Sequence, residues 1–146
     1  MKYSVDLKMG AKAYGRDLSI STKQSFEICN NIKGKSVAYA KYLLEKNIAK
    51  ELPVPMKRYK KDTAHKKAIA AGKYPVNAAT NILTILKSAE SNAQNQGLSS
   101  KNLFIAHISA HKASTPWHYG RQRRRKMKRT HIQIILQEKA KRDKND

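Results

Sequence analysis

The spacing of apolar residues along the chain predicts three helices. The first is expected at about residues 22–33, and the second starts after a capping residue, Ser36, and ends before the proline-containing stretch 52–55. The third and longest is expected at about residues 77–96, where Gly97 closes it. Each has one apolar stripe, so all three can pack on a common core. The stripes comprise Phe26, Cys29 and Ile32; Val37, Ala40, Leu43, Leu44 and Ile48; and Ala79, Ile82, Leu83, Leu86, Ala89 and Ala93.

The first predicted helix carries signals at its ends and a single thiol inside it. Ser21 and Gln24 have the spacing of a capping box, and Gly34 is a typical C-terminal stop. Cys29 is the only cysteine of the chain, and its place in the apolar stripe favours burial over a reactive thiol. With one cysteine, the chain can form neither an internal disulfide nor a zinc site made of cysteines.

Beyond the third helix the apolar period changes to two, which predicts two antiparallel strands at Leu103–Lys112 and His131–Gln137. Antiparallel strands often bury one face and expose the other. The residues expected on the apolar face are Phe104, Ala106, Ile108 and Ala110 in the first strand, and Ile132, Ile134 and Leu136 in the second.

The N-terminal segment, residues 1–20, has an extended and basic character. Tyr3 and Val5 alternate with polar residues, and Gly10 and Gly15 are expected to break regular structure. The pattern therefore predicts a short edge strand within this segment.

A long connection joins the two predicted strands. Its 18 residues, 113–130, exceed an ordinary hairpin loop, and their polar composition argues against burial. If both arms continue as a ribbon, about nine residues each at ~3.3 Å per residue would project about 30 Å beyond the sheet. A ribbon without a core is largely disordered in water, so this extended hairpin is expected to become ordered against a partner.

The charge of the chain indicates the class of that partner. The 31 Lys and Arg residues against 10 Asp and Glu residues give a net charge of +21 at pH 7, and residues 91–137 contain no acidic residue. Such a chain attracts polyanions, among which nucleic acid is the leading candidate. No apolar run approaches the ~18 residues of a membrane-spanning helix and the N-terminus lacks a secretory apolar block, so a soluble, intracellular protein without a membrane partner is expected.

Two basic segments supply most of the predicted phosphate contacts, because guanidinium and ammonium groups bind phosphate and release counterions. The insertion, residues 52–74, contains prolines and one acid, Asp62, and is expected to follow an irregular path that a partner orders. The competing interpretations are a solvated loop for the hairpin and a mobile linker for the insertion. The predicted contacts are Lys112, Arg121, Arg123, Arg124, Arg125, Lys126, Lys128 and Arg129 in the hairpin; Lys57, Arg58, Lys60, Lys61, Lys66, Lys67 and Lys73 in the insertion; and Lys12, Arg16 and Lys23 as an extension of the footprint.

Aromatic residues accompany both basic segments. Tyr59 lies within the insertion, and Trp117, His118 and Tyr119 directly precede the arginine cluster. Flat rings beside cations can stack on unpaired RNA bases. For Trp117, His118 and Tyr119, a local apolar plug at the hairpin tip is an equally good explanation. Because the basic residues of the chain are spread over separate segments, a large folded RNA is favoured over a single DNA groove.

Other chemistries find little support. His107 and His111 share a strand face but lie about 13 Å apart at ~3.3 Å per residue, so they are not expected to chelate one metal ion. The chain has no glycine-rich phosphate loop, nucleophile elbow or catalytic pair of acids, and neither an enzyme nor a cofactor is expected. The alternative functions are a basic DNA-binding or DNA-compacting module and, after it, a nucleic-acid-modifying enzyme.

Short motifs in a fixed order run almost the whole length of the chain. Together they resemble the family of the universal large-subunit ribosomal protein number twenty-two, in its archaeal and eukaryotic branch. The motifs are Tyr3-Ser4-Val5-Asp6, Ala11-Lys12-Ala13, Gly15-Arg16, Ile20-Ser21, Glu27-Ile28-Cys29, Ile32-Lys33-Gly34, Val54-Pro55-Met56-Lys57-Arg58-Tyr59, Gly72-Lys73-Tyr74-Pro75, Ala89-Glu90-Ser91-Asn92-Ala93, Gly97-Leu98, His107-Ile108-Ser109-Ala110-His111-Lys112 and His131-Ile132.

The resemblance implies one α+β domain over residues 1–146, with three helices packed on a small antiparallel three-stranded sheet and a long protruding hairpin. It implies a cytoplasmic, non-enzymatic constituent of the large ribosomal subunit that binds ribosomal RNA beside neighbouring ribosomal proteins, without forming a homo-oligomer. It also implies that the hairpin lines the nascent-peptide exit tunnel, where it would meet the nascent peptide. Gly120-Arg121 resembles the pair near the family's hairpin tip, so the implied tunnel-lining residues are Pro116, Trp117, His118, Tyr119, Gly120, Arg121, Gln122, Arg123 and Arg124.

Overall fold

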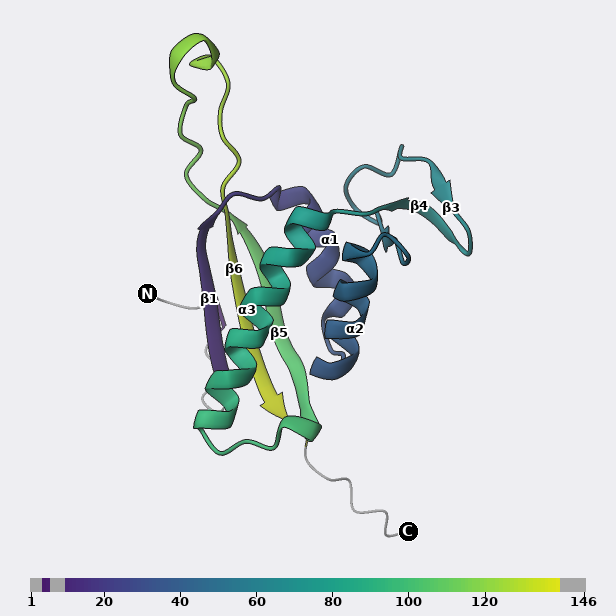
Figure 1. Cartoon of the computed structure of the whole chain (residues 1–146), viewed down its shortest axis with the longest axis vertical. Helices are drawn as coiled ribbons and strands as arrows, with labels where there is room; N and C mark the ends of the chain where they lie inside the picture. The colour runs from purple at the N-terminus through teal and green to yellow at the C-terminus, as the bar shows by residue number, and fades with distance from the viewer. Residues whose placement is uncertain (1–3, 6–9, 140–146) are drawn as a thin grey trace.

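A three-stranded antiparallel sheet forms one layer of the molecule (Figure 1). The computed structural model describes residues 4–5 and 10–139. The strands are β1 (Ala11–Leu18), β5 (Leu103–Lys112) and β6 (Thr130–Glu138), and their order is β1-β6-β5. The central strand, β6, pairs antiparallel with both neighbours, so the two predicted C-terminal strands are confirmed.

The edge strand expected near the N-terminus is present as β1, but the residues whose alternation predicted it are not part of it. Tyr3 lies outside the described residues, and Val5 is exposed and belongs to no strand. Gly15 lies within the strand and does not end it, although the pairing of β1 with β6 becomes irregular between Gly15 and Leu18. A Cβ atom at Gly15 would lie 2.3 Å from Cδ1 of Ile85, so the glycine permits close packing of the third helix on the strand.

The face predicted for β5 is wrong in its first half. A register irregularity between Ile105 and His107 shifts the alternation by one residue. Leu103 and Ile105 are therefore buried in the core before the irregularity, and Ile108 is buried after it. Phe104 and Ala106, which the pattern placed on the apolar face, are only partly buried.

Three helices pack on the sheet, as predicted: α1 (Thr22–Ile32), α2 (Val37–Ile48) and α3 (Val76–Asn95). The helix α3 contacts β1 and β6, α1 contacts β5, and α2 packs against α3 (Figure 1). The hydrophobic core combines most residues of the three helical stripes with Ile132, Ile134 and Leu136 of β6. Phe26, which was predicted to belong to the first stripe, lies outside the core and is only partly buried. The predicted α+β fold of three helices and a small antiparallel sheet is confirmed.

The capping predictions had different outcomes. Ser36 accepts a hydrogen bond from the backbone N–H of Tyr39 at 3.4 Å, which caps α2. Ser21 occupies the N-cap position of α1, but its side chain makes no capping hydrogen bond, so the predicted capping box is wrong. Its carbonyl oxygen instead accepts from the hydroxyl of Ser25 at 2.9 Å.

Part of the basic insertion forms a second small sheet, so the irregular path predicted for it is wrong at these strands, whereas residues 56–64 belong to no helix or strand. Its strands are β2 (Val54–Pro55), β3 (His65–Lys66) and β4 (Ile69–Lys73), in the order β2-β4-β3. Val54 and Met56 are buried in the main core, which joins this sheet to the helical layer. No described helix is both long and apolar enough to span a bilayer.

Candidate nucleic-acid interface

The hairpin of β5 and β6 continues beyond the sheet as a narrow extension of residues 113–129, which projects from one end of the molecule (Figure 1). Backbone hydrogen bonds join its two arms: the N–H of Ala113 donates to Arg129, and the N–H of Met127 donates to Pro116, at 3.0 and 2.8 Å. Nearer the tip, the N–H of His118 donates to the carbonyl of Arg125 at 2.8 Å. The two arms are therefore paired along most of the extension.

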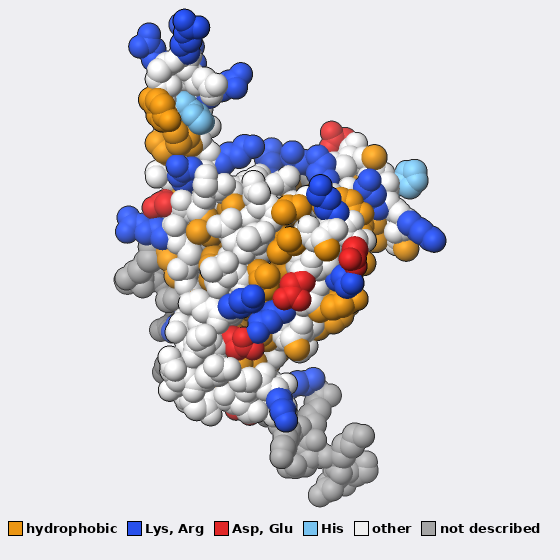
Figure 2. Space-filling model, viewed as in Figure 1, with side chains coloured by type: hydrophobic (Ala, Val, Ile, Leu, Met, Phe, Trp, Pro, Cys, Tyr) orange, Lys and Arg blue, Asp and Glu red, His pale blue; other side chains and the backbone are white. Residues whose placement is uncertain are grey.

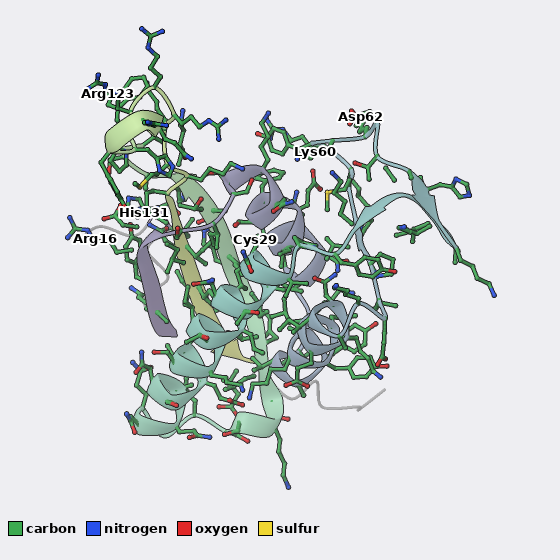
Figure 3. All side chains as sticks on the ribbon, turned by 45° about the horizontal axis from the view of Figure 1, so that its top comes forward. Arg16, Cys29, Lys60, Asp62, Arg123 and His131 are labelled. Atoms are coloured by element: carbon green, nitrogen blue, oxygen red, sulfur yellow. The ribbon has the colours of Figure 1, made fainter. Side chains whose placement is uncertain are left out.

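Cationic side chains gather at the tip and near the base of the extension (Figure 2), and residues 113–129 include no carboxylate. A short 3-10 helix, Gly120–Gln122, turns the chain at the tip, and Gly120 has a φ of 62°, which favours glycine. Arg123 extends outward from this tip (Figure 3). The exposed predicted contacts are Lys112, Arg121, Arg123, Arg124, Arg125, Lys126 and Lys128.

The aromatic residues of the tip are accessible. Trp117 is 57% exposed and Tyr119 is 85% exposed, which does not fit a closed apolar plug. The ammonium of Lys126 lies 4.5 Å from the centroid of the Trp117 ring, across the bridge that pairs these two residues. Cation and ring thus form a single surface on which a base or a phosphate can be placed.

Arg129 differs from the other basic residues of the hairpin because its guanidinium is hydrogen-bonded to other residues of the protein. It donates to the hydroxyl of Ser19 at 3.1 Å and to the carbonyl of Lys128 at 2.9 Å. Beside it, the hydroxyl of buried Thr130 lies 2.8 Å from the hydroxyl of partly buried Thr22. These contacts fix the base of the extension to the start of α1.

A buried carboxylate holds the beginning of the insertion. Glu27 of α1 is 1% exposed, and its two oxygens accept hydrogen bonds from the backbone N–H groups of Lys57, Arg58 and Tyr59 at 3.1, 2.8 and 2.6 Å. The backbone of three predicted contact residues is therefore positioned by one side chain. Glu27 was not predicted to have this role, and its only signal was an acid adjacent to the core residues Ile28 and Cys29.

Cations and rings also meet where the insertion touches α1. The rings of Phe26 and Tyr59 make an edge-on contact at 5.4 Å, and the guanidinium of Arg58 lies 5.0 and 5.4 Å from their centroids. The ammonium of Lys23 lies 5.9 Å from the Tyr59 ring. The structure thus brings together three of the predicted contact residues from two separate segments.

The remaining predicted contacts lie on other surfaces. Arg16 extends from the edge strand with its side chain 74% exposed, and it pairs with Asp17 at 3.1 Å (Figure 3). Lys66 lies 5.8 Å from the ring of Tyr74. Lys60, Lys61 and Lys67 are exposed. Lys12 and Lys73 are partly buried.

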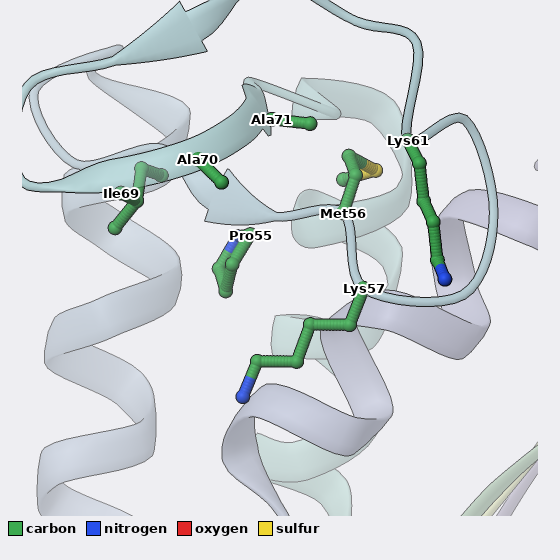
Figure 4. A pocket seen from close by; sticks show the side chains of 7 residues that line it. All are labelled: Pro55, Met56, Lys57, Lys61, Ile69, Ala70 and Ala71. Atoms are coloured by element: carbon green, nitrogen blue, oxygen red, sulfur yellow. The ribbon is translucent and has the colours of Figure 1, made fainter.

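Hollows of the surface lie beside the insertion. One, of about 570 Å³, lies beside β2 and β4 and is lined by Pro55, Met56, Ile69, Ala70 and Ala71 together with Lys57 and Lys61 (Figure 4). Another, of about 540 Å³, lies between the insertion, α1 and the hairpin. It unites the predicted contacts Lys23, Tyr59, Lys60, Lys112, Lys128 and Arg129.

Among the described residues, no group of three or more His, Cys, Asp or Glu could hold a metal ion. Burial, together with the positive charges of Lys33 and His111, lowers the pKa of His107. Cys29 is buried, as predicted, and burial raises the pKa of its thiol to about 12.

Comparison with known proteins identifies the family. The family described as ribosomal protein L22p/L17e matches residues 13–137. A protein of Nanoarchaeum equitans named large ribosomal subunit protein uL22 is 42% identical over 148 residues, which cover 94% of this chain and 84% of the relative. Proteins of the same name from Methanosphaera stadtmanae and Methanopyrus kandleri are 42% and 39% identical, over 88% and 92% of this chain and 88% and 91% of their own lengths.

These relatives are large-subunit ribosomal proteins of archaea, in agreement with the predicted class, which is structural and not enzymatic. The resemblance inferred from the motifs is therefore confirmed. The chain belongs to the L22p/L17e family of ribosomal proteins.

Proposed function

We propose that the protein binds large-subunit ribosomal RNA in the cytoplasm, and that its hairpin extension lies between RNA segments and lines the nascent-peptide exit tunnel. One observation carries the proposal: two paired arms present exposed cations on a narrow projection, residues 113–129, that contains no carboxylate. A projection of this kind repels itself in water and is stabilised by surrounding phosphates.

The distribution of charge supports a large RNA as the partner. Lys and Arg side chains occur at the hairpin tip, at its base and across the insertion, on surfaces that face different directions (Figure 2). A single DNA groove would engage one face, whereas converging RNA segments can surround the protein. The names of the relatives favour the same choice over a DNA-compacting module.

The tunnel role rests on the tip of the extension. The proposed lining residues, 116–124, occupy the end farthest from the sheet and include the exposed rings of Trp117 and Tyr119. In this arrangement residues 1–146 act as a single domain, of which the insertion, 52–74, binds a second RNA segment beside neighbouring ribosomal proteins. The nascent peptide is the partner of the tip, and no second copy of the chain is required.

Two experiments test the proposal. The protein should remain with large ribosomal subunits when they are sedimented through high salt, whereas loss into the supernatant would indicate loose adsorption. For the tunnel, a photo-crosslinking residue at Gln122, which is exposed at the tip, should label a radioactive nascent chain in stalled ribosomes. The same group at exposed Lys87 of α3 should not, and equal labelling from both positions would contradict the tunnel role.

A further inference from the structure

The 540 Å³ groove lies where three parts of the chain meet. The start of α1 contributes Lys23 and Phe26, the insertion contributes Tyr59 and Lys60, and the base of the hairpin contributes residues of both arms. Figure 2 shows Lys and Arg side chains gathered in the region between the base of the extension and the insertion. The volume is within the range of about 300–1,000 Å³ that is typical of small-ligand sites.

The walls of the groove are held in place by contacts inside the protein. The amide of Tyr59 is fixed by the buried carboxylate of Glu27 at 2.6 Å. The hairpin wall is fixed by the hydrogen bond between Thr22 and Thr130 and by the bond from Arg129 to Ser19. A site whose walls are already positioned loses little conformational entropy when a ligand binds.

The lining combines two chemistries. Its cations are Lys23, Lys60, Lys112, Lys128 and Arg129, and its lining residues include no acid. Cations alone would suit any phosphate backbone, paired or unpaired. The rings of Phe26 and Tyr59 add flat apolar surface, which favours a ligand that has a planar aromatic part next to a phosphate.

We propose that this groove binds an unpaired nucleotide of the RNA, with its base against the Tyr59 and Phe26 rings and its adjacent phosphates on the lysines. The proposal rests on RNA binding as the function of the protein and assigns one site within that function. A base held in a duplex cannot reach the rings, because its faces are covered by its neighbours. The groove therefore distinguishes single-stranded from paired RNA.

Binding of the full-length protein to a single-stranded RNA hexamer and to a GC-rich RNA duplex of six base pairs, in which each strand has as many phosphates as the hexamer, tests the site. Tyr59→Leu should weaken hexamer binding about 5- to 150-fold, which corresponds to the loss of one stacked base, and should leave duplex binding unchanged. Tyr59→Phe should bind the hexamer as the wild type does. The matched control is Tyr39→Leu on α2, because Tyr39 is 48% exposed, lies 4.8 Å from the ammonium of Lys35 and is remote from the groove lining.

A second pair of variants tests the charged wall without disturbing the Tyr59 ring. Lys60→Gln combined with Lys112→Gln should flatten the salt dependence of hexamer binding by about 1.4 logarithmic units, at ~0.7 for each single-strand phosphate contact. Both lysines are exposed, so the fold should be retained. Lys87→Gln with Lys101→Gln removes the same charge from surfaces outside the groove and should leave the slope unchanged.

The outcomes separate the groove from the general function. If Tyr59→Leu and the Lys60 and Lys112 double variant both bind the hexamer like the wild type, while loss of the tip arginines weakens binding, the groove proposal is wrong and RNA binding stands. If the wild type binds neither RNA, the proposed function itself fails. If a free nucleoside monophosphate binds as tightly as the hexamer, the groove is a small-molecule site, and its assignment to RNA is overturned.

Discussion

The carboxylate of Glu27 in α1 accepts a hydrogen bond from the backbone N–H of Tyr59 at 2.6 Å, across 32 residues of sequence. With the two neighbouring bonds, this contact joins the insertion to the helical layer. The Glu27 side chain is therefore a structural element of the proposed RNA interface, although it is an acid and the proposed contact residues are basic or aromatic.

Replacing Glu27 should loosen the insertion and destabilise the protein. Glu27→Ala leaves three backbone N–H groups without their acceptor, and a buried unsatisfied group costs about 1–3 kcal/mol, so a loss of a few kcal/mol is expected. Glu27→Gln retains one oxygen and should cost less. Chemical denaturation measures the stability, and hydrogen exchange at Lys57, Arg58 and Tyr59 should accelerate. Unchanged exchange at these amides would contradict the anchoring role.

Removing the three consecutive arginines at the hairpin tip should weaken RNA binding and its dependence on salt. Arg123, Arg124 and Arg125 are all exposed, so their replacement by alanine should leave the melting temperature almost unchanged. If each contacts one duplex-like phosphate, the salt slope flattens by up to about 2.7 logarithmic units. Equilibrium binding at several salt concentrations measures the slope, and a slope equal to that of the wild type would count against these contacts.

Limited proteolysis of the free protein should cleave the segment 113–130 before the helices. Trypsin cuts after Lys and Arg, and the tip carries several exposed arginines beyond the last cross-strand hydrogen bonds. The helices bury their apolar stripes in the core and should be spared. Added RNA should protect the tip. Resistance of the tip equal to that of the helices would mean that the extension is stable by itself.

The Cys29 thiol should be unreactive in the folded protein. It is 3% exposed, and burial raises its pKa to about 12, so almost no thiolate is present near neutral pH. A thiol-specific chromogenic reagent at pH 8 should therefore react only after denaturant is added. Rapid labelling of the native protein would show that this part of α1 opens readily.

Acidification should destabilise the protein partly through His107. Its pKa is lowered in the folded state, chiefly by burial and further by Lys33 and His111, so the unfolded chain binds the proton more tightly. The contribution of His107 to stability is therefore complete above its unfolded pKa, about 6.5, and decreases as the pH falls through that value. His107→Gln should make the free energy of unfolding depend less steeply on pH between pH 7.5 and pH 5. His65→Gln, in the exposed strand β3, removes a histidine from a different surface and is the variant for comparison.

The helices and main strands could be predicted from the sequence because their signals are local. The expected helix at 77–96 and the observed α3, Val76–Asn95, differ by one residue at each end. The expected strand His131–Gln137 and the observed β6, Thr130–Glu138, also differ by one residue at each end. Apolar spacing and glycine stops act within a few residues, so they can be interpreted without knowledge of the tertiary structure.

The failures came from contacts between distant residues. The irregularity at Ile105 depends on the pairing of β5 with β6, and Gly15 is explained by Ile85 of α3. The strands of the insertion depend on Val54 and Met56 reaching the core and on Glu27 binding the following backbone. The basic residues proposed as contacts were chosen from the sequence by their charge, whereas the groove that brings some of them together depends on the fold.

The central claim is that the cationic hairpin extension is embedded in ribosomal RNA, and the structure of the assembled large subunit tests it most directly. We expect several of the basic side chains of residues 121–129 to lie within hydrogen-bonding distance of phosphate oxygens, with the tip at the tunnel wall. An extension that projects into open solvent, away from any nucleotide, would contradict the account.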